Sequence, residues 1–478
     1  MTKILLFIFL IFAGLAGSGE TALWLTGDFH HHTWLTDGRH TQEEVAARAF
    51  NHYFLDWLVN SEHGGRFGRD PQGRALPAPL WRWLTLRDLS FPIIQDLRRR
   101  YPDKFLLQGL EWNIPAHDHA GVGIIKDEPA AISDFEYMFD RKDLDHSREG
   151  EGLRKRHTRH EDALAAVRWL REKYAGESYL IINHPSRKMK YSAADLRDFH
   201  QAAMPDLCFG LEGIPGHQKA PQRGGYNQDL GGASGLARTY GGADYMVAKV
   251  GGMWDALLGE GRRIWIFANS DFHHTDNDFW PGEYAKTYTR VPNRSYSGLV
   301  QAWRAGCSFV VTGNLITALD FRAEAQNRQA VMGETLRVRR GEGVRVLIRF
   351  QSRNAHSPHP PAKVDHVDLI AGEMKNPALP GTPGYKQEDN PTTRLLARFL
   401  KNDWRSEAGW ELMEYRLSKV ERDMYLRLRG TNLGLGVADE TDEEGNPLCD
   451  DLMGPNNAAK AWRDLWFYSN PIFIQVER

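Results

Sequence analysis

Residues 22–33 read Ala-Leu-Trp-Leu-Thr-Gly-Asp-Phe-His-His-His-Thr, so an apolar stretch runs directly into three consecutive histidines. The apolar stretch predicts a buried β-strand. Because side chains alternate across a strand, we expect His30 and His32 on one face, able to hold the same cation, while His31 points away. Imidazole nitrogens suit Zn, Mn, Fe and related divalent ions. Asp37, in the loop that follows, can add a carboxylate oxygen.

The same arrangement recurs along the first part of the chain, where apolar stretches end in residues that can bind a metal. The stretches cover residues 54–59, 105–110, 179–182, 209–211 and 264–268, and His63, Glu111, His184, Glu212, Asp271 and His273 follow them. Helical patterns separate the stretches, and one helix opens at the capping box of residues 41–44. Strands that alternate with helices predict a parallel sheet or barrel, whose strand ends share one rim.

Length and composition indicate an ordinary globular protein of more than one domain. A chain of 478 residues predicts two domains, and 60 basic against 62 acidic residues leave a formal charge of -2. That balance gives no reason to expect nucleic acid or an anionic membrane surface, so a small-molecule substrate is expected. Oligomeric state stays open. Beyond about residue 320, alternating segments at 344–350, 367–370 and 471–476 predict a β-rich, sandwich-like domain. We therefore expect domains at 22–320 and 321–478.

The N-terminus predicts a signal peptide over residues 1–19. Lys3 precedes an apolar run over residues 4–13, and small residues follow. The run is shorter than the roughly 20 apolar residues of a membrane-spanning helix. We expect export to the periplasm or medium, with no stable membrane insertion once the segment is removed. An uncleaved anchor or a buried first helix remains the alternative.

Five motifs occur in order over roughly residues 22–320. They are Asp28-Phe29-His30-His31-His32-Thr33-Trp34-Leu35-Thr36-Asp37-Gly38, Ser61-Glu62-His63, Gly109-Leu110-Glu111, His184-Pro185 and Ser270-Asp271-Phe272-His273. Together they resemble the PHP (polymerase and histidinol phosphatase) superfamily. The resemblance implies a distorted (β/α)7 barrel that binds two or three divalent metal ions, Zn, Mn or Fe. Carried over position by position, the implied ligands are His30, His32, Asp37, His63, Glu111, His119, His184, Asp271 and His273. His117 is an alternative to His119.

Within that superfamily, the exported N-terminus, the β-rich domain and the sequence Ser469-Asn470-Pro471-Ile472 resemble the CehA/McbA group, which includes a carbamate insecticide hydrolase. The amidohydrolase superfamily also begins with His-x-His on a barrel strand. It would be expected to use a ligating Lys, and no Lys stands out at a strand end here.

The expected chemistry is hydrolysis of small-molecule phosphate esters through a metal-bound hydroxide. Three carboxylates cannot neutralise two or three divalent ions, so the pocket should favour an anion, and metals bring the pKa of bound water to about 7. Arg187 and Arg66 are candidate substrate clamps, because guanidinium matches phosphate. His217 is placed to protonate the leaving group, and Glu212 can orient a ligand histidine. Residues 64–102 and 213–252 are expected as loops over the rim.

Two other functions remain open. One is hydrolysis of carboxyl or carbamate esters, which the CehA/McbA resemblance favours. The other is an exported metal- or carbohydrate-binding protein without catalysis, although a binding module has no need of nine ligands.

Overall fold

The computed structural model describes residues 23–226, 236–352, 362–450 and 457–477. The segment predicted as a signal peptide lies outside these residues. Among the helices that are described, none has the length and apolar character needed to span a membrane.

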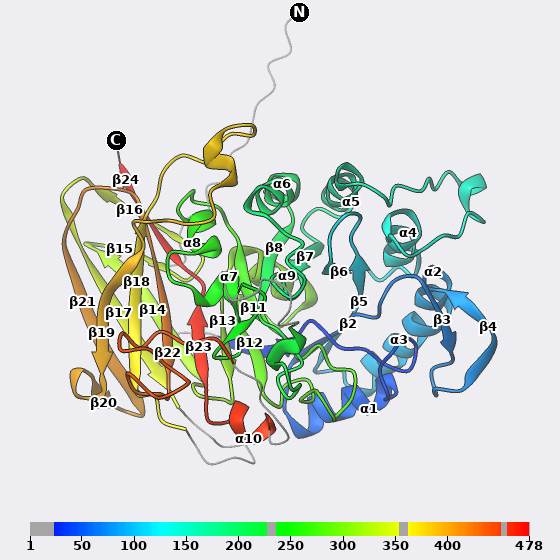
Figure 1. Cartoon of the computed structure of the whole chain (residues 1–478), viewed down its shortest axis with the longest axis horizontal. Coiled ribbons are helices and arrows are strands. Elements are labelled where there is room, and N and C mark those ends of the chain that lie inside the picture. Colours follow the sequence, from blue (N-terminus) through cyan, green and yellow to red (C-terminus); the bar gives the residue numbers. More distant parts are fainter. Residues whose placement is uncertain (1–22, 227–235, 353–361, 451–456, 478) are drawn as a thin grey trace, which may run out of the picture.

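The first part of the chain forms a long mixed sheet covered by helices (Figure 1). Its strands are β1 (Leu23–Asp28), β2 (Trp57–Asn60), β5 (Phe105–Asn113), β6 (His119–Ile124), β7 (Ser178–Ile182), β8 (Cys208–Ile214), β11 (Trp265–Ala268), β12 (Ala285–Val291) and β13 (Ser308–Thr312). They lie in the order β11-β8-β7-β6-β5-β2-β1-β12-β13. The apolar stretches predicted as strands all fall in this sheet, and most of its strands are buried from end to end.

Most neighbours among β1, β2, β5, β7, β8 and β11 pair in parallel, while β6 runs antiparallel between β5 and β7. The carboxyl ends of the parallel strands therefore lie at the same edge as the amino end of β6. This edge is the rim predicted from the sequence. Because β6 begins at His119, that residue joins the rim from the opposite chain direction.

Helices α3 (Phe91–Arg100), α4 (Ala130–Phe139), α5 (His160–Lys173), α6 (Ala193–Ala203) and α9 (Tyr296–Ala305) accompany the sheet, with the shorter helices α1 (Gln42–Ala47), α2 (Arg82–Thr85), α7 (Tyr245–Ala248) and α8 (Met253–Leu258) (Figure 1). Thr41 caps α1 in the predicted capping box, and a wider helical turn extends that helix over Arg48–His52. The mixed α/β organisation is thus confirmed.

The expected distorted (β/α)7 barrel is not confirmed, because the sheet formed by the described strands is not closed. On one side β1 pairs antiparallel with β12 over five residues, and β11 pairs only with β8 among the described strands. No ladder therefore joins β1 to β11. A single bridge between His31 and Phe272, just beyond these two strands, closes the gap at the rim alone.

The second part of the chain is β-rich (Figure 1). One five-stranded sheet contains β14 (Ala318–Ala325), β15 (Arg328–Val331), β17 (Glu342–Gln351), β20 (Arg405–Glu407) and β21 (Trp410–Val420). The strands β16 (Thr335–Arg339), β18 (His366–Glu373), β19 (Arg394–Leu400), β22 (Met424–Thr431), β23 (Trp466–Ser469) and β24 (Ile472–Glu477) extend the first sheet instead. The strands predicted at 344–350 and 367–370 lie within β17 and β18, and the strand predicted at 471–476 lies within β24 except at its first residue.

Both parts share this extended sheet, because β23 pairs with β13. The boundary predicted near residue 320 falls inside β14. A fully buried ion pair also links the parts: Arg427 of β22 donates two hydrogen bonds, of 2.8 and 2.7 Å, to Asp255 of α8. The two parts are therefore joined by backbone pairing and by a buried charge pair.

Candidate metal centre

The segments beyond β1 and β11 are fixed to each other by a buried aspartate. Asp28 accepts hydrogen bonds from the backbone N–H of His30 at 2.7 Å and of Ser270 at 2.8 Å. Burial raises the pKa of Asp28 to about 7 despite these bonds. The N–H of His32 donates to the carbonyl of Phe272 at 2.8 Å. The histidine run thus lies beside Asp271 and His273, although the two segments are 240 residues apart along the chain.

One group of buried side chains forms around Glu111 of β5. It contains His30, His32, Glu111 and Asp271, whose ligand atoms lie within 4.8 Å of one another. The Nε2 atoms of His30 and His32 are 3.1 Å apart. Oδ1 of Asp271 lies 3.1 Å from Nε2 of His30 and 3.3 Å from Nε2 of His32. Four donors therefore point at a common centre.

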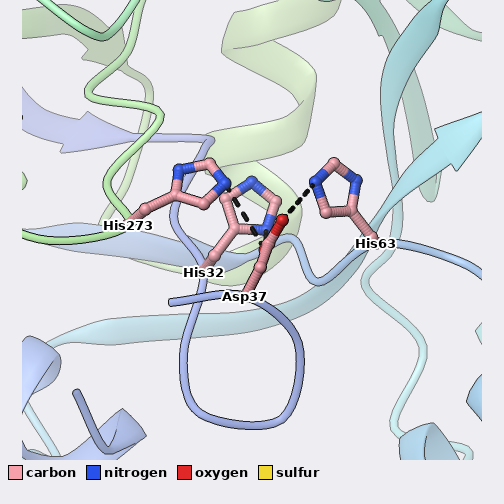
Figure 2. A group of neighbouring side chains, drawn as sticks. All are labelled: His32, Asp37, His63 and His273. Carbon is pink, nitrogen blue, oxygen red and sulfur yellow. Dashed lines mark ion pairs between the residues drawn. The ribbon is translucent and has the colours of Figure 1, made fainter. Parts of the chain in front are cut away.

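A second group shares His32 and also contains Asp37, His63 and His273 (Figure 2). Its Asp37 carboxylate lies between two imidazoles, 3.4 Å from Nε2 of His63 and 3.4 Å from Nε2 of His273. The His32 ring stacks on the rings of His63 and His273, with centroids 4.5 and 4.1 Å apart. Burial raises the pKa of Asp37, but hydrogen bonds from His273 and His63 outweigh it and hold that pKa well below its usual range.

The remaining predicted ligands join through Glu111 as well. His63, Glu111 and His119 form one group, and Asp118, His119 and His184 form another. Oε1 of Glu111 lies 3.1 Å from Nδ1 of His119 and 3.2 Å from Nε2 of His184. All nine predicted ligands are therefore brought together at one rim.

These groups have the donor chemistry that divalent ions require. Nδ1 of His63 lies 2.8 Å from Oε2 of Glu111, yet neither atom has a partner with hydrogen-bond geometry among the described residues. The same holds for Nδ1 of His184 and Oδ2 of Asp118, which are 3.4 Å apart. A buried polar atom without a partner costs about 1–3 kcal/mol. A cation bound between these atoms would satisfy them, so the residues present fit divalent metal ions.

Carboxylates behind the rim orient the inner imidazoles. Glu212 of β8 is fully buried and accepts from Nδ1 of His30 at 3.0 Å, as the sequence suggested. It also accepts from the backbone N–H of His184 at 2.7 Å and from the amide of Asn269 at 3.0 Å. A carboxylate on Nδ1 leaves Nε2 free to bind a metal. His31 points away from the groups, toward Gln42, at 3.1 Å.

His217 reaches the rim beside Asp271. Its Nε2 lies 3.2 Å from Oδ2 of Asp271, and its Nδ1 lies 2.5 Å from the buried carboxylate of Asp278. Burial lowers the pKa of His217, but these two carboxylates outweigh it and raise that pKa to about 10. The two carboxylates therefore favour the protonated form of His217.

The two predicted substrate arginines differ in position. Arg187 donates to Oδ2 of Asp271 at 3.0 Å, and its buried Nη2 has no partner among the described residues. Arg66, in the hairpin of β3 (Arg66–Arg69) and β4 (Ala75–Trp81), donates to the carbonyl of Pro79 and stacks on Trp81 at 5.1 Å. Arg187 thus faces the rim, whereas the guanidinium of Arg66 interacts with its own hairpin.

Sequence reasoning missed four residues here. Asp118 joins a ligand group, and Asp278 supports His217. Arg39 and Arg69 line an open pocket of about 390 Å³ that also contains Asp37 and Phe67. Asp118 had a detectable signal, because it separates two histidines. The other three are loop or hairpin residues whose place depends on the fold.

His117 takes no part in the Glu111 groups. Its Nδ1 lies 2.8 Å from the carbonyl of Lys190, and its Nε2 lies 2.8 Å from His160. Of the two histidines that the sequence left as alternatives, His119 is the one beside Glu111. His274, adjacent to a candidate ligand, pairs with Asp276 at 3.4 Å.

The chain bears a distant likeness to a solved structure. No protein-family model matches the chain, and no curated protein matches it. A solved structure from Bacteroides vulgatus, described as a two-domain protein containing a predicted PHP-like metal-dependent phosphoesterase, aligns over 90% of this chain and 96% of its own. The two are 12% identical, with a TM-score of 0.38. The resemblance of this chain to the PHP superfamily rests on the sequence motifs described above.

Proposed function

We propose that this protein is a metal-dependent hydrolase that acts on phosphate esters of small molecules. The observation that carries the proposal is the convergence of the nine predicted ligands, with Asp118, at one rim. Two or three divalent ions, Zn, Mn or Fe, would be held there. When bound, such ions polarise a phosphoryl oxygen and make water nucleophilic at neutral pH.

The residues around the rim suit the departure of an alkoxide or phenoxide. The carboxylates of Asp271 and Asp278 favour the protonated form of His217, whose Nε2 faces Asp271 at 3.2 Å. A protonated imidazole at this position can donate its proton to the leaving oxygen. Asp278 keeps the ring in place from behind, because it binds Nδ1 at 2.5 Å. His217 is therefore the proposed general acid.

Positive side chains give the site its preference for an anion. Asp118 is a fourth carboxylate beside Asp37, Glu111 and Asp271. Four carboxylates would balance the charge of two divalent ions. The excess positive charge inferred from the sequence would then come from nearby cationic side chains. Arg187 offers an unpartnered, buried Nη2 beside Asp271. A guanidinium donor of this kind binds a phosphoryl oxygen well.

The pocket beside Asp37 indicates where the rest of the substrate lies. Arg39 and Arg69 line it together with Phe67, whose ring stacks on that of His63 at 6.4 Å. A volume of about 390 Å³ suits a small molecule. We propose Arg39 and Arg69, in place of Arg66, as further anion-binding side chains in addition to Arg187.

A panel of aryl phosphates, aryl carboxylates and aryl carbamates tests the proposal, with protein purified without chelator and its metal content measured. We expect phosphatase activity that falls at least 100-fold in His30→Ala. His31→Gln, one residue along but facing Gln42, is the matched control and should keep both metal and activity. Strong esterase or carbamatase activity without phosphatase activity would show that the substrate is a carboxyl or carbamate ester and not a phosphate ester. Full activity and full metal content in His30→Ala would refute the site itself.

Arg187→Met and Arg69→Met test the anion-binding assignment. We expect the KM for an aryl phosphate to rise about 10-fold or more in each, since a charge-assisted hydrogen bond contributes about 1.5–3 kcal/mol. Arg66→Met should leave KM within about twofold. Equal KM values in all three variants would contradict the assignment.

We also propose that the chain is exported after removal of residues 1–19. The basic start, short apolar run and small residues that follow support this. N-terminal sequencing of protein from fractionated cells would test it, and an intact N-terminus in the cytosolic fraction would count against it.

A further inference from the structure

A second set of metal-type side chains lies away from the Glu111 groups. His117 precedes β6, His160 is the first residue of α5, and Asp195 lies in the first turn of α6. Their ligand atoms lie within 4.8 Å of one another. Helices α5 and α6 pack side by side, so three separate parts of the chain meet here (Figure 1).

The hydrogen bonds of the two imidazoles leave a lone pair on each facing nitrogen. Nδ1 of His117 lies 2.8 Å from the carbonyl oxygen of Lys190, which can only accept, so Nδ1 carries the hydrogen. Nε2 of His160 lies 3.3 Å from the carboxylate of Asp198 and carries its hydrogen for the same reason. In neutral rings, the nitrogens that face each other at 2.8 Å, Nε2 of His117 and Nδ1 of His160, then both hold lone pairs. Two lone pairs at this distance repel each other, so a cation, either a proton or a metal ion, lies between them.

The surroundings match those of a metal-binding histidine pair. A ligating imidazole usually donates its other N–H to a carboxylate or a backbone carbonyl, and both partners are present here. His30 in the rim shows the same pattern, with Glu212 on Nδ1 and a second histidine facing Nε2 at 3.1 Å. The lone-pair arrangement therefore repeats a feature of the candidate metal centre.

We propose that His117, His160 and Asp195 form a second divalent-cation site, which binds Zn²⁺ or an ion with the same ligand preference. Two imidazole nitrogens and one carboxylate oxygen are ordinary zinc ligands. Oδ1 of Asp195 lies 3.9 Å from Nδ1 of His160. Ligands in a tetrahedral zinc site lie about 3.4 Å apart, so side-chain shifts of about 1 Å or less complete the site.

The site is accessible and has a structural consequence. Asp195 lines a cavity of about 620 Å³, which gives an ion a route of entry. Tyr191 stacks on His117, and its hydroxyl donates to the carbonyl of His119 at 2.9 Å. An ion on His117 would therefore fix the loop that presents Asp118 and His119 to the rim. It would also tie α5 to α6.

Metal stoichiometry tests this inference. Apo protein from exhaustive chelation is titrated with Zn²⁺ alone, in a His32→Ala background that weakens the rim sites. We expect His160→Gln and Asp195→Asn each to bind one equivalent fewer than their parent. His146→Gln is the matched control, since that side chain is 62% exposed and pairs with Glu149. It should bind as much Zn²⁺ as the parent.

Thermal unfolding gives a second readout. Saturating Zn²⁺ should raise the Tm of the parent more than that of either variant. Asp195→Asn keeps the shape of its helix turn. If His160→Gln fails to fold, the Zn²⁺ stoichiometry of Asp195→Asn tests the proposal. Equal stoichiometry and equal Tm shifts in Asp195→Asn and the parent would overturn the proposal and leave a histidine pair that shares a proton. The result is independent of the hydrolase proposal, because no substrate is used.

Discussion

Glu212→Gln is the most informative single change, because it preserves volume while altering what one buried side chain can accept. Glu212 accepts three hydrogen bonds: from Nδ1 of His30, from the amide of Asn269 and from the backbone N–H of His184. A glutamine has only one side-chain oxygen, so its NH₂ group must face one of the donors that Glu212 now accepts from, and two donors cannot bond to each other. If the NH₂ faces His184, a buried N–H loses its partner at a cost of about 1–3 kcal/mol.

If the NH₂ instead faces His30, that ring must accept at Nδ1 and carry its hydrogen on Nε2. Nε2 is the atom that faces His32 at 3.1 Å, where a metal would bind. In either orientation His30 also loses a charged partner, which makes it a weaker ligand. Such partners are worth 10–100-fold in metal affinity, or about 1.4–2.8 kcal/mol.

Chelator competition measures the affinity directly, with circular dichroism to show that the variant is folded. Glu62→Gln is the matched control, because Glu62 is equally buried but accepts from the hydroxyls of Thr33 and Thr36, which can reorient. We expect at least a 10-fold loss for Glu212→Gln and less than threefold for Glu62→Gln. Wild-type affinity in Glu212→Gln would refute the reasoning, either because His30 is no ligand or because Glu212 does not orient it.

Three further outcomes are expected. Removal of metal by a chelator should lower Tm, because the carboxylates of the rim lose their counter-charges, and addition of Zn²⁺ or Mn²⁺ should restore it. An unchanged Tm would contradict metal binding at the rim. Arg427→Met should lower the free energy of unfolding in urea by about 3–5 kcal/mol, because it leaves Asp255 charged and buried. The double variant Arg427→Met with Asp255→Leu should recover most of this loss. A double variant no more stable than the single one would show that the ion pair is not the cause. Lys286→Met should stabilise the protein at pH 7, because burial lowers the pKa of Lys286 to about 8 and the charged form is disfavoured by at most about 3 kcal/mol. The Lys286 ammonium loses its proton at lower pH in the folded protein than in the unfolded chain, so the free energy of unfolding of the wild type should rise relative to that of Lys286→Met between about pH 8 and 10. A constant difference in stability across that range would argue against a buried, charged Lys286.

Much of the site could be predicted because it depends on local pattern. Most candidate ligands follow or begin a buried strand, while Glu111 lies within the last residues of β5, and parallel strands present their ends at one edge. Alternation along a strand was sufficient to separate His31 from its neighbours, and the side chain of His31 lies against Gln42.

Other features depend on contacts that sequence spacing does not encode. The open sheet follows from the pairing of β1 with β12, and those strands are separated by more than 250 residues. The choice of His119 over His117 follows from the start of β6, which fixes the direction of each side chain. Asp278 reaches His217 through the fold of a loop, and the stacking of Arg66 on Trp81 follows from a hairpin register.

The pairing of β13 with β23 has a consequence for synthesis. Thr312 and Trp466, which bond across these strands, are 154 residues apart. At about 5–20 residues per second, a ribosome needs roughly 10–30 s to make the intervening chain. During that interval β13 is an unpaired edge beside an almost complete sheet, and such edges recruit other strands. The nascent protein therefore has a defined window of aggregation risk, in which a chaperone that covers this edge would raise the yield of folded protein.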